Sequence, residues 1–143
     1  MSLDPNTPIL VVDDYKTMVK IVRHLLGQLG YKNVDDASNG AEAFEKMKTK
    51  EYGLVISDWN MEPVTGYELL QRMRASEAHA DIPFIMVTGL TNNQAVLEAR
   101  KAGVTGFLAK PFRLEELKKK LTVVLRPDAG GEKPHDGDAF FDV

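Results

Sequence analysis

The chain contains no cysteine among its 143 residues, which excludes disulfide bonds, thiolate metal sites and a cysteine nucleophile. Its three histidines, His24, His79 and His135, lie in separate segments, so they predict neither a metal triad nor a phosphorelay histidine. No apolar stretch reaches the roughly 18 residues that a membrane helix needs. The N-terminus lacks the basic and then apolar pattern of a signal peptide. We therefore expect a cytoplasmic protein without a membrane partner.

An excess of positive charge is also missing. Residues 126–143 hold two basic and five acidic residues, a net charge of −3, whereas the remainder of the chain holds sixteen of each sign. A neutral body with an acidic tail has no electrostatic footprint for nucleic acid, so we expect no nucleic-acid partner.

The composition predicts three parts. Residues 1–7 form a short N-terminal extension, residues 8–125 are one domain, and residues 126–143 are a flexible acidic tail, because glycine and proline are mixed with acids there. The last five residues of the tail, Ala-Phe-Phe-Asp-Val, are apolar enough to dock on the domain. A frayed terminus is the preferred interpretation.

Four apolar runs are present, and each ends in polar residues. Continuous apolar runs spaced by helix-like segments are typical of buried parallel strands. In an open parallel sheet, chemistry gathers at the carboxyl ends of the strands. We therefore expect the polar residues to meet at one edge. The runs are 9–12, ending in Asp13 and Asp14; 54–57, ending in Asp58; 84–87, ending in Thr88; and 107–109, ending in Lys110.

The alternation of strand and helix, five times over, predicts an α/β fold: a doubly wound five-stranded parallel sheet with helices on both faces. The polar strand 34–37 suits an edge position. Capping-box spacings open three of the helices, at Asn39 with Glu42, Thr65 with Glu68, and Thr91 with Gln94.

Two helices have clear apolar faces. The helix over about 15–29 and the last helix each repeat apolar residues at three-and-four spacing. The predicted buried residues are Met18, Ile21, Val22, Leu25 and Leu29 in the first helix, and Leu114, Leu117, Leu121 and Val124 in the last, where Lys118, Lys119 and Lys120 should face water.

The expected edge of the sheet suits a divalent cation. Asp13, Asp14 and Asp58 carry a formal charge of −3, and Lys110 reduces it to −2, which one divalent ion would neutralise. Clustered carboxylates resist ionising beside one another without such compensation. Oxygen ligands without histidine or cysteine favour a hard ion, and so few protein ligands favour Mg²⁺ with a phosphate group over Ca²⁺.

These motifs, in this order, resemble the receiver domains of bacterial two-component response regulators. The carrying residues are Asp13-Asp14, Asp58, Thr88 and Lys110-Pro111, and the likeness spans roughly residues 8–125. The segment Asp58-Trp59-Asn60-Met61 is most similar to the single-domain chemotaxis regulators of the CheY type. The resemblance implies a flavodoxin-like strand order 2-1-3-4-5.

The resemblance also implies roles for the site residues. Asp58 would accept a phosphoryl group from a sensor histidine kinase or a small acyl phosphate. Asp14, Asp58 and the backbone carbonyl of Asn60 would bind Mg²⁺ directly, with Asp13 helping through water. Lys110 would pair with the phosphoryl oxygens. Phosphoryl transfer needs this positioning and charge neutralisation more than covalent help.

Further expectations from the resemblance concern switching and lifetime. Thr88 and Phe107 would form the switch, with Phe107 standing where many relatives have tyrosine. The Lys110–Pro111 peptide bond should be cis. Asn60 and Leu90 would tune dephosphorylation by flanking the path of the attacking water.

A second departure from the family lies in the loop after Asp58. Relatives usually have proline directly after the methionine, whereas here Glu62 precedes Pro63. This difference affects the expected conformation of the loop and not its chemistry.

The predicted function is that of a stand-alone response regulator. It would catalyse only its own phosphoryl transfer and dephosphorylation, and would bind a downstream protein through its fourth helix, fifth strand and fifth helix, where basic residues including Arg100, Lys101 and Arg113 gather. Chemotaxis is one possible pathway, and a phosphorelay shuttle or a phosphate sink are alternatives. A Mg²⁺-dependent aspartyl-phosphate hydrolase is disfavoured because Asn60 replaces the expected acid. A flavin module is disfavoured because Asp13 and Asp14 would repel phosphate.

Overall fold

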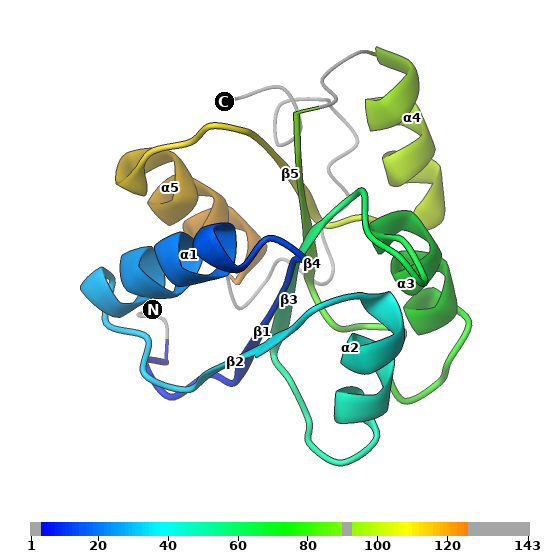
Figure 1. The fold of residues 1–143 in the computed structure, drawn as a ribbon, viewed down its shortest axis with the longest axis horizontal. Coiled ribbons are helices and arrows are strands. Elements are labelled where there is room, and N and C mark those ends of the chain that lie inside the picture. Colours follow the sequence, from blue (N-terminus) through cyan, green and yellow to red (C-terminus); the bar gives the residue numbers. More distant parts are fainter. Residues whose placement is uncertain (1–3, 90–92, 126–143) are drawn as a thin grey trace.

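The structure is a computed structural model that describes residues 4–89 and 93–125. Its centre is a five-stranded sheet in which all neighbouring strands pair in parallel, in the order β2-β1-β3-β4-β5 (Figure 1). This confirms the predicted fold class and strand order, including the edge position of the polar strand. The strands are β1 (Ile9–Val12), β2 (Val34–Ala37), β3 (Leu54–Asp58), β4 (Phe84–Thr88) and β5 (Gly106–Ala109).

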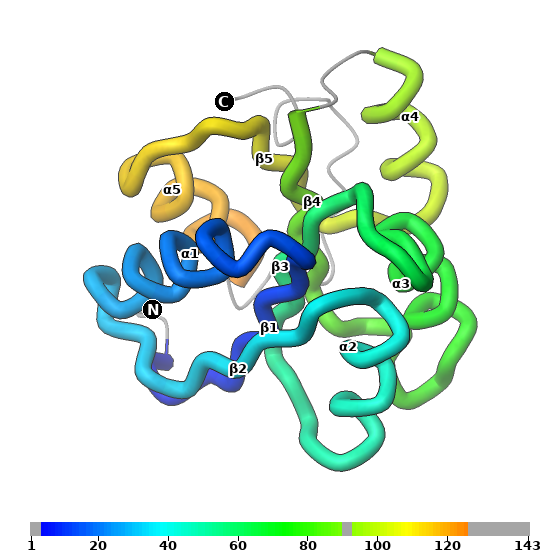
Figure 2. The backbone as a smooth tube through the Cα atoms, in the orientation of Figure 1, coloured from blue at the N-terminus to red at the C-terminus, as the bar shows by residue number. Residues whose placement is uncertain are grey.

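Five helices cover the two faces of the sheet. They are α1 (Lys16–Gln28), α2 (Gly40–Met47), α3 (Gly66–Arg74), α4 (Asn93–Ala102) and α5 (Leu114–Val124). In Figures 1 and 2, α1 and α5 lie on one side of the sheet, and α2, α3 and α4 lie on the other. This is the doubly wound arrangement that the alternating pattern predicts. Among the described residues, no helix is long and apolar enough to cross a membrane.

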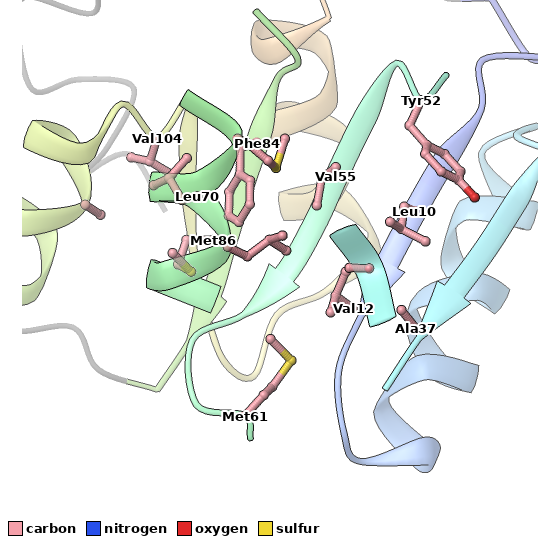
Figure 3. Close-up of a cluster of buried hydrophobic side chains, with 14 of the residues drawn as sticks. Leu10, Val12, Ala37, Tyr52, Val55, Met61, Leu70, Phe84, Met86 and Val104 are labelled. Carbon is pink, nitrogen blue, oxygen red and sulfur yellow. The ribbon is translucent and has the colours of Figure 1, made fainter. Parts of the chain in front are cut away.

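The core has two layers because side chains of each strand alternate between the faces. One cluster combines Leu10, Val55 and Met86 with buried residues of α2, α3 and α4, and Figure 3 shows part of it. The other cluster combines Ile9, Ile56 and further strand residues with α1 and α5. The sheet is thus buried on both sides, which explains its nearly continuous apolar strands.

Two predictions about helix faces are wrong in part. Ile21 is 46% exposed, whereas Val19, Val22 and Leu26 form the buried stripe of α1. The apolar residues of α1 occupy two neighbouring stripes, and the sheet covers the one that passes through Val19. In α5, Lys120 is 5% exposed and lies beside the buried Leu121, so the three lysines do not all face water.

The predicted helix starts are confirmed where they are described. Asn39 accepts a hydrogen bond from the Glu42 N–H at 2.9 Å, although the Glu42 carboxylate accepts from the Ser38 N–H instead of that of Asn39. Thr65 and Glu68 form the complete reciprocal capping box that opens α3. Thr91 lies outside the described residues, as do the tail 126–143 and the predictions made for it.

Candidate functional site

Three carboxylates meet at the carboxyl ends of β1 and β3. These strands are neighbours, with Val12 paired to Ser57, so the residues that follow them emerge side by side. One oxygen from each of Asp13, Asp14 and Asp58 lies within 4.8 Å of the others. Asp13 is buried, Asp58 is half-buried and Asp14 is exposed. The cluster therefore runs from the protein interior to the solvent.

Lys110 brings a positive charge to this cluster from the end of β5. Its Nζ lies 2.9 Å from Asp58 Oδ1 and 3.6 Å from Asp13 Oδ2. Its backbone N–H donates to the Thr88 carbonyl at 2.9 Å, which ties the end of β5 to the end of β4. The Lys110–Pro111 peptide bond is cis, as expected. The three acids and Lys110 leave a formal charge of −2.

The surroundings shift the protonation of two of these groups. Burial raises the pKa of Asp13, and repulsion from Asp58 and Asp14 adds to that effect, although the Tyr15 N–H and Lys110 act against it. For Lys110, burial alone would lower the pKa. Its hydrogen bond to Asp58 and its attraction to Asp13 outweigh burial, so the pKa of Lys110 is raised. Lys110 is thus held as a cation.

The same cluster could hold a divalent metal ion. Three carboxylates within reach of one point supply oxygen ligands only, which suits a hard cation. Three acids beside one lysine leave a formal charge of −2 that Lys110 does not compensate. Asn60 follows two residues after Asp58 and is exposed. A divalent ion at this point would neutralise the formal charge that remains.

The two predicted switch residues are buried on neighbouring strands. Thr88 ends β4 and Phe107 lies in β5, each with 2% exposure. Phe107 pairs with Met86, and Thr88 pairs with Ala109. Because side chains alternate along β4, Thr88 faces the same side of the sheet as Met86, which is the side that α4 covers. Leu90, the predicted modulator of dephosphorylation, lies outside the described residues.

Two residues that sequence reasoning missed fix the backbone of Asp58. The Ser57 hydroxyl, fully buried, donates to the Asp58 carbonyl at 2.9 Å. Gly66 approaches so closely that a Cβ there would lie 2.0 Å from the same carbonyl oxygen. The Gly66 N–H also donates to the Trp59 carbonyl at 2.8 Å. The absent side chain of Gly66 therefore lets α3 begin directly against the end of β3.

The loop between β3 and α3 has an unusual backbone. The Glu62–Pro63 peptide bond is cis, and Val64 has a φ of 67°, which β-branched residues rarely adopt. The Val64 carbonyl accepts a hydrogen bond from the Gly40 N–H at 3.0 Å, so the loop is joined to the start of α2. Trp59 is half-buried, and its ring stacks on Tyr67 with centroids 5.5 Å apart.

Most of the basic residues predicted for the partner surface are exposed. Lys101, Arg113, Lys118 and Lys119 are exposed, Arg100 is half-buried, and the buried Lys120 does not belong to it. Leu97 of α4, an apolar residue, is 45% exposed.

Comparisons with known proteins identify relatives over most of the chain. The sequence profile described as response regulator receiver domain matches residues 9–122. Chemotaxis protein CheY-3 of Vibrio cholerae is 40% identical over 119 residues, which is 83% of this chain and 92% of the relative. Chemotaxis protein CheY of Pseudomonas aeruginosa is 38% identical over 113 residues, 79% of this chain and 91% of the relative.

Solved structures of chemotaxis proteins and receiver domains also resemble this chain. The chemotaxis protein CheY4 of Vibrio cholerae superposes with a TM-score of 0.79 at 35% identity, covering 84% of this chain and 99% of that one. The receiver domain of a sensor histidine kinase from Pseudomonas aeruginosa, with a magnesium ion coordinated in its active site cleft, superposes with a TM-score of 0.77 at 26% identity, covering 84% and 98% of the two chains.

Proposed function

The chain belongs to the response regulator receiver family, and from that membership we propose that it is a stand-alone signalling switch phosphorylated on Asp58. The observation that carries the proposal is the position of Lys110, whose ammonium lies 2.9 Å from Asp58 Oδ1 within a cluster of three carboxylates. A nucleophilic carboxylate beside a fixed cation is what a phosphoryl group needs, because its transfer depends on positioning and charge neutralisation.

The phosphoryl donor would be the phosphohistidine of a sensor kinase or a small acyl phosphate. An oxygen of Asp58 attacks the phosphorus, the bond to the donor breaks in line with it, and the electron pair leaves with the donor atom. The product is an acyl phosphate on Asp58. Lys110 then leaves its ion pair with the Asp58 carboxylate and pairs with the phosphoryl oxygens instead. The new contact is a charge-assisted hydrogen bond, which is stronger than one between neutral groups.

We propose Mg²⁺ as the ion of the acidic cluster. Asp14, Asp58 and the backbone carbonyl of Asn60 would hold it directly, and Asp13 would hold one of its waters. When bound, the ion would neutralise the negative charge on the phosphoryl oxygens during transfer. The acids and their uncompensated charge support this assignment, as does the magnesium ion in the related receiver domain.

Thr88 and Phe107 would carry the signal away from Asp58. A phosphoryl oxygen offers the Thr88 hydroxyl a charge-assisted partner, and the movement of Thr88 leaves space for Phe107 on the face that α4 covers. Inverting a population from 1:99 to 99:1 takes about 5.5 kcal/mol. A few hydrogen bonds to a charged group, at roughly 1.5–3 kcal/mol each, suffice for that change.

The output would be a change in partner binding on the face formed by α4, β5 and α5. That face carries the exposed Leu97 and the basic residues Lys101 and Arg113. Chemotaxis is the pathway that we propose, because the curated relatives described above are chemotaxis proteins.

Asn60 would hold the water that later hydrolyses the acyl phosphate.

Intact-mass measurement after treatment with acetyl phosphate and Mg²⁺ tests the phosphorylation site. The wild-type chain should gain the mass of one phosphoryl group, and Asp58→Asn should gain none. Asp36→Asn is a matched control because Asp36 lies on the edge strand, paired with Arg23. Modification of Asp58→Asn to the wild-type extent would refute the assignment.

Titration with Mg²⁺ alone tests the metal site. The fluorescence of Trp59 should change and saturate in the wild-type chain, because this half-buried ring directly follows Asp58. The change should vanish in Asp14→Ala. An unaltered titration in that variant would place the ion elsewhere.

A further inference from the structure

A pocket on the α1 and α5 side of the sheet is separate from the acidic cluster. It has a volume of about 260 Å³ and is lined by Pro5, Leu29, Tyr31, Lys118, Leu121 and Thr122. The N-terminal wall is fixed by a hydrogen bond of 3.2 Å from the Lys32 N–H to the Pro5 carbonyl. The pocket is therefore mostly apolar, with one cation at its rim.

Tyr31 gives this pocket an unusual polar group. The residue is 5% exposed, and its hydroxyl is buried without a hydrogen-bond partner among the described residues. Burial also raises the pKa of this phenol, so it is held as a donor. Buried hydroxyls are normally paired, because an unmade hydrogen bond in the interior is unfavourable. Tyr31 therefore indicates an acceptor that the described residues do not supply.

We propose that residues 139–143 of this chain occupy the pocket. One phenyl ring of the pair Phe140-Phe141 would fill the apolar part, and an oxygen of the same segment would accept from the Tyr31 hydroxyl. An apolar cavity of about 150 Å³ already admits a benzene ring. The pocket, at about 260 Å³, has room for one such ring and a polar group. One of the two phenylalanine rings is therefore enough to fill it.

The charge distribution of the chain also favours residues 139–143 as the occupant of the pocket. Residues 126–143 carry a net charge of −3, whereas the remainder of the chain is formally neutral. Lys118 lines the pocket, and Lys119 beside it is exposed. An acidic segment that follows α5 would therefore be attracted to this end of the domain. The attraction is weakened by salt, because these charges face solvent.

The length of the connecting segment permits docking. The pocket residues Leu121 and Thr122 lie within the last turn of α5, only a few positions before residue 126 in the sequence. Residues 126–139 can span up to roughly 45 Å when extended, which exceeds the distance across a domain of this size. A tethered segment also acts at a high local concentration, so weak contacts can hold it.

A spin label tests this docking in the full chain. The chain has no cysteine, so Gly137→Cys gives one labelling position without a change of charge. We expect the label to remove more than half of the amide signal intensity of Tyr31, Leu121 and Thr122. The amides of Phe44 and His79, whose rings contact each other on the opposite layer, should keep theirs.

Two variants and one mixture make the result decisive. Phe140→Ser with Phe141→Ser should restore the three signals, and Tyr31→Phe should restore them in part. Uniform broadening, or broadening that survives the double serine change, would overturn the proposal. Labelled chains mixed with isotope-enriched unlabelled chains report on a second copy. Strong broadening in that mixture would also overturn it, because the occupant would then be another molecule.

Discussion

Replacing Asp13 by asparagine should stabilise the protein while it weakens metal binding. Asp13 lies within 4.8 Å of Asp14 and Asp58, and 3.6 Å from Lys110. With an effective dielectric constant of about 20, each repulsion at 4.8 Å is roughly 3.5 kcal/mol and the attraction at 3.6 Å is roughly 4.6 kcal/mol. The two repulsions together exceed the one attraction. Without metal, we therefore expect Asp13→Asn to raise the free energy of unfolding by about 2 kcal/mol. The exposure of Asp14 reduces this gain.

Added metal should narrow the difference in stability between the two proteins. Asparagine keeps an oxygen for the Tyr15 N–H but removes one negative charge, so the formal charge of the site falls from −2 to −1. We expect Mg²⁺ to bind at least about tenfold more weakly, a loss of roughly 1.4 kcal/mol. Since a ligand that binds only the folded state stabilises it, added Mg²⁺ should raise the wild-type free energy of unfolding more.

Urea denaturation with and without Mg²⁺ measures both effects. Asp35→Asn is the control, because Asp35 accepts hydrogen bonds from Lys50 and Tyr52 and should lose stability at any Mg²⁺ concentration. The reasoning fails if Asp13→Asn is no more stable than the wild type without metal, or if Mg²⁺ stabilises both proteins equally.

The pH dependence of the two aspartates has opposite signs. Burial, followed by repulsion, raises the folded-state pKa of Asp13 above its ordinary 3.8, so stability falls as the pH rises from that value through the folded pKa. The hydrogen bond from Lys50, followed by that from Tyr52, lowers the pKa of Asp35, so its contribution is present above 3.8 and is lost as the pH falls through the folded pKa. Above pH 3.8, Asp13→Asn should therefore remove the fall in the free energy of unfolding that Asp13 causes, which urea denaturation at several pH values would measure.

Three further predictions concern single residues. Lys110→Ala should still bind Mg²⁺ but lose the gain in partner affinity on phosphorylation, which calorimetry with the partner would measure; an equal gain in both proteins would refute its role. Arg74→Met should lower the free energy of unfolding by about 3 kcal/mol, because the guanidinium donates to the carbonyls of Ala80, Ile82 and Gly103; a loss below about 1 kcal/mol in urea would contradict this. Gly66→Ala should destabilise by at least about 2 kcal/mol through its clash with the Asp58 carbonyl, whereas Gly27→Ala, with open space in α1, should stabilise by up to about 1 kcal/mol.

Much of the fold was predictable because the strands are continuous apolar runs that end in polar residues. That pattern fixes where each strand stops, and parallel pairing then brings the polar ends together. Asp13, Asp58 and Lys110 could be placed at one edge for this reason. The cap at Thr65 was predictable because it depends on residues three positions apart.

The errors arose where a pattern allowed more than one orientation. Ile21 fits a three-and-four apolar spacing, but α1 has two such stripes and only the sheet decides between them. Three consecutive lysines span about 200° of a helix and so do not share one direction, and here Lys120 is the one that is buried.

Long-range contacts left no local signal at all. Arg74 reads as an ordinary exposed residue at a helix end, yet it donates to Ala80 and Ile82 in the segment before β4 and to Gly103, which is 29 residues away in the sequence. The backbone of Val64 was also not predictable, because its conformation depends on packing against Gly40.

The hydrogen bonds of Arg74 have a mechanical consequence for α4. They hold Gly103, directly after the last turn of that helix, to the end of α3 and to the segment before β4. The first residue of α4, Asn93, instead follows Thr88 by five positions at the edge where the acids lie. A displacement that begins at Thr88 thus reaches α4 at the end opposite its anchor. We expect α4 to rotate about Gly103 as a rigid body, so that its first turn is displaced most and its last turn is displaced least.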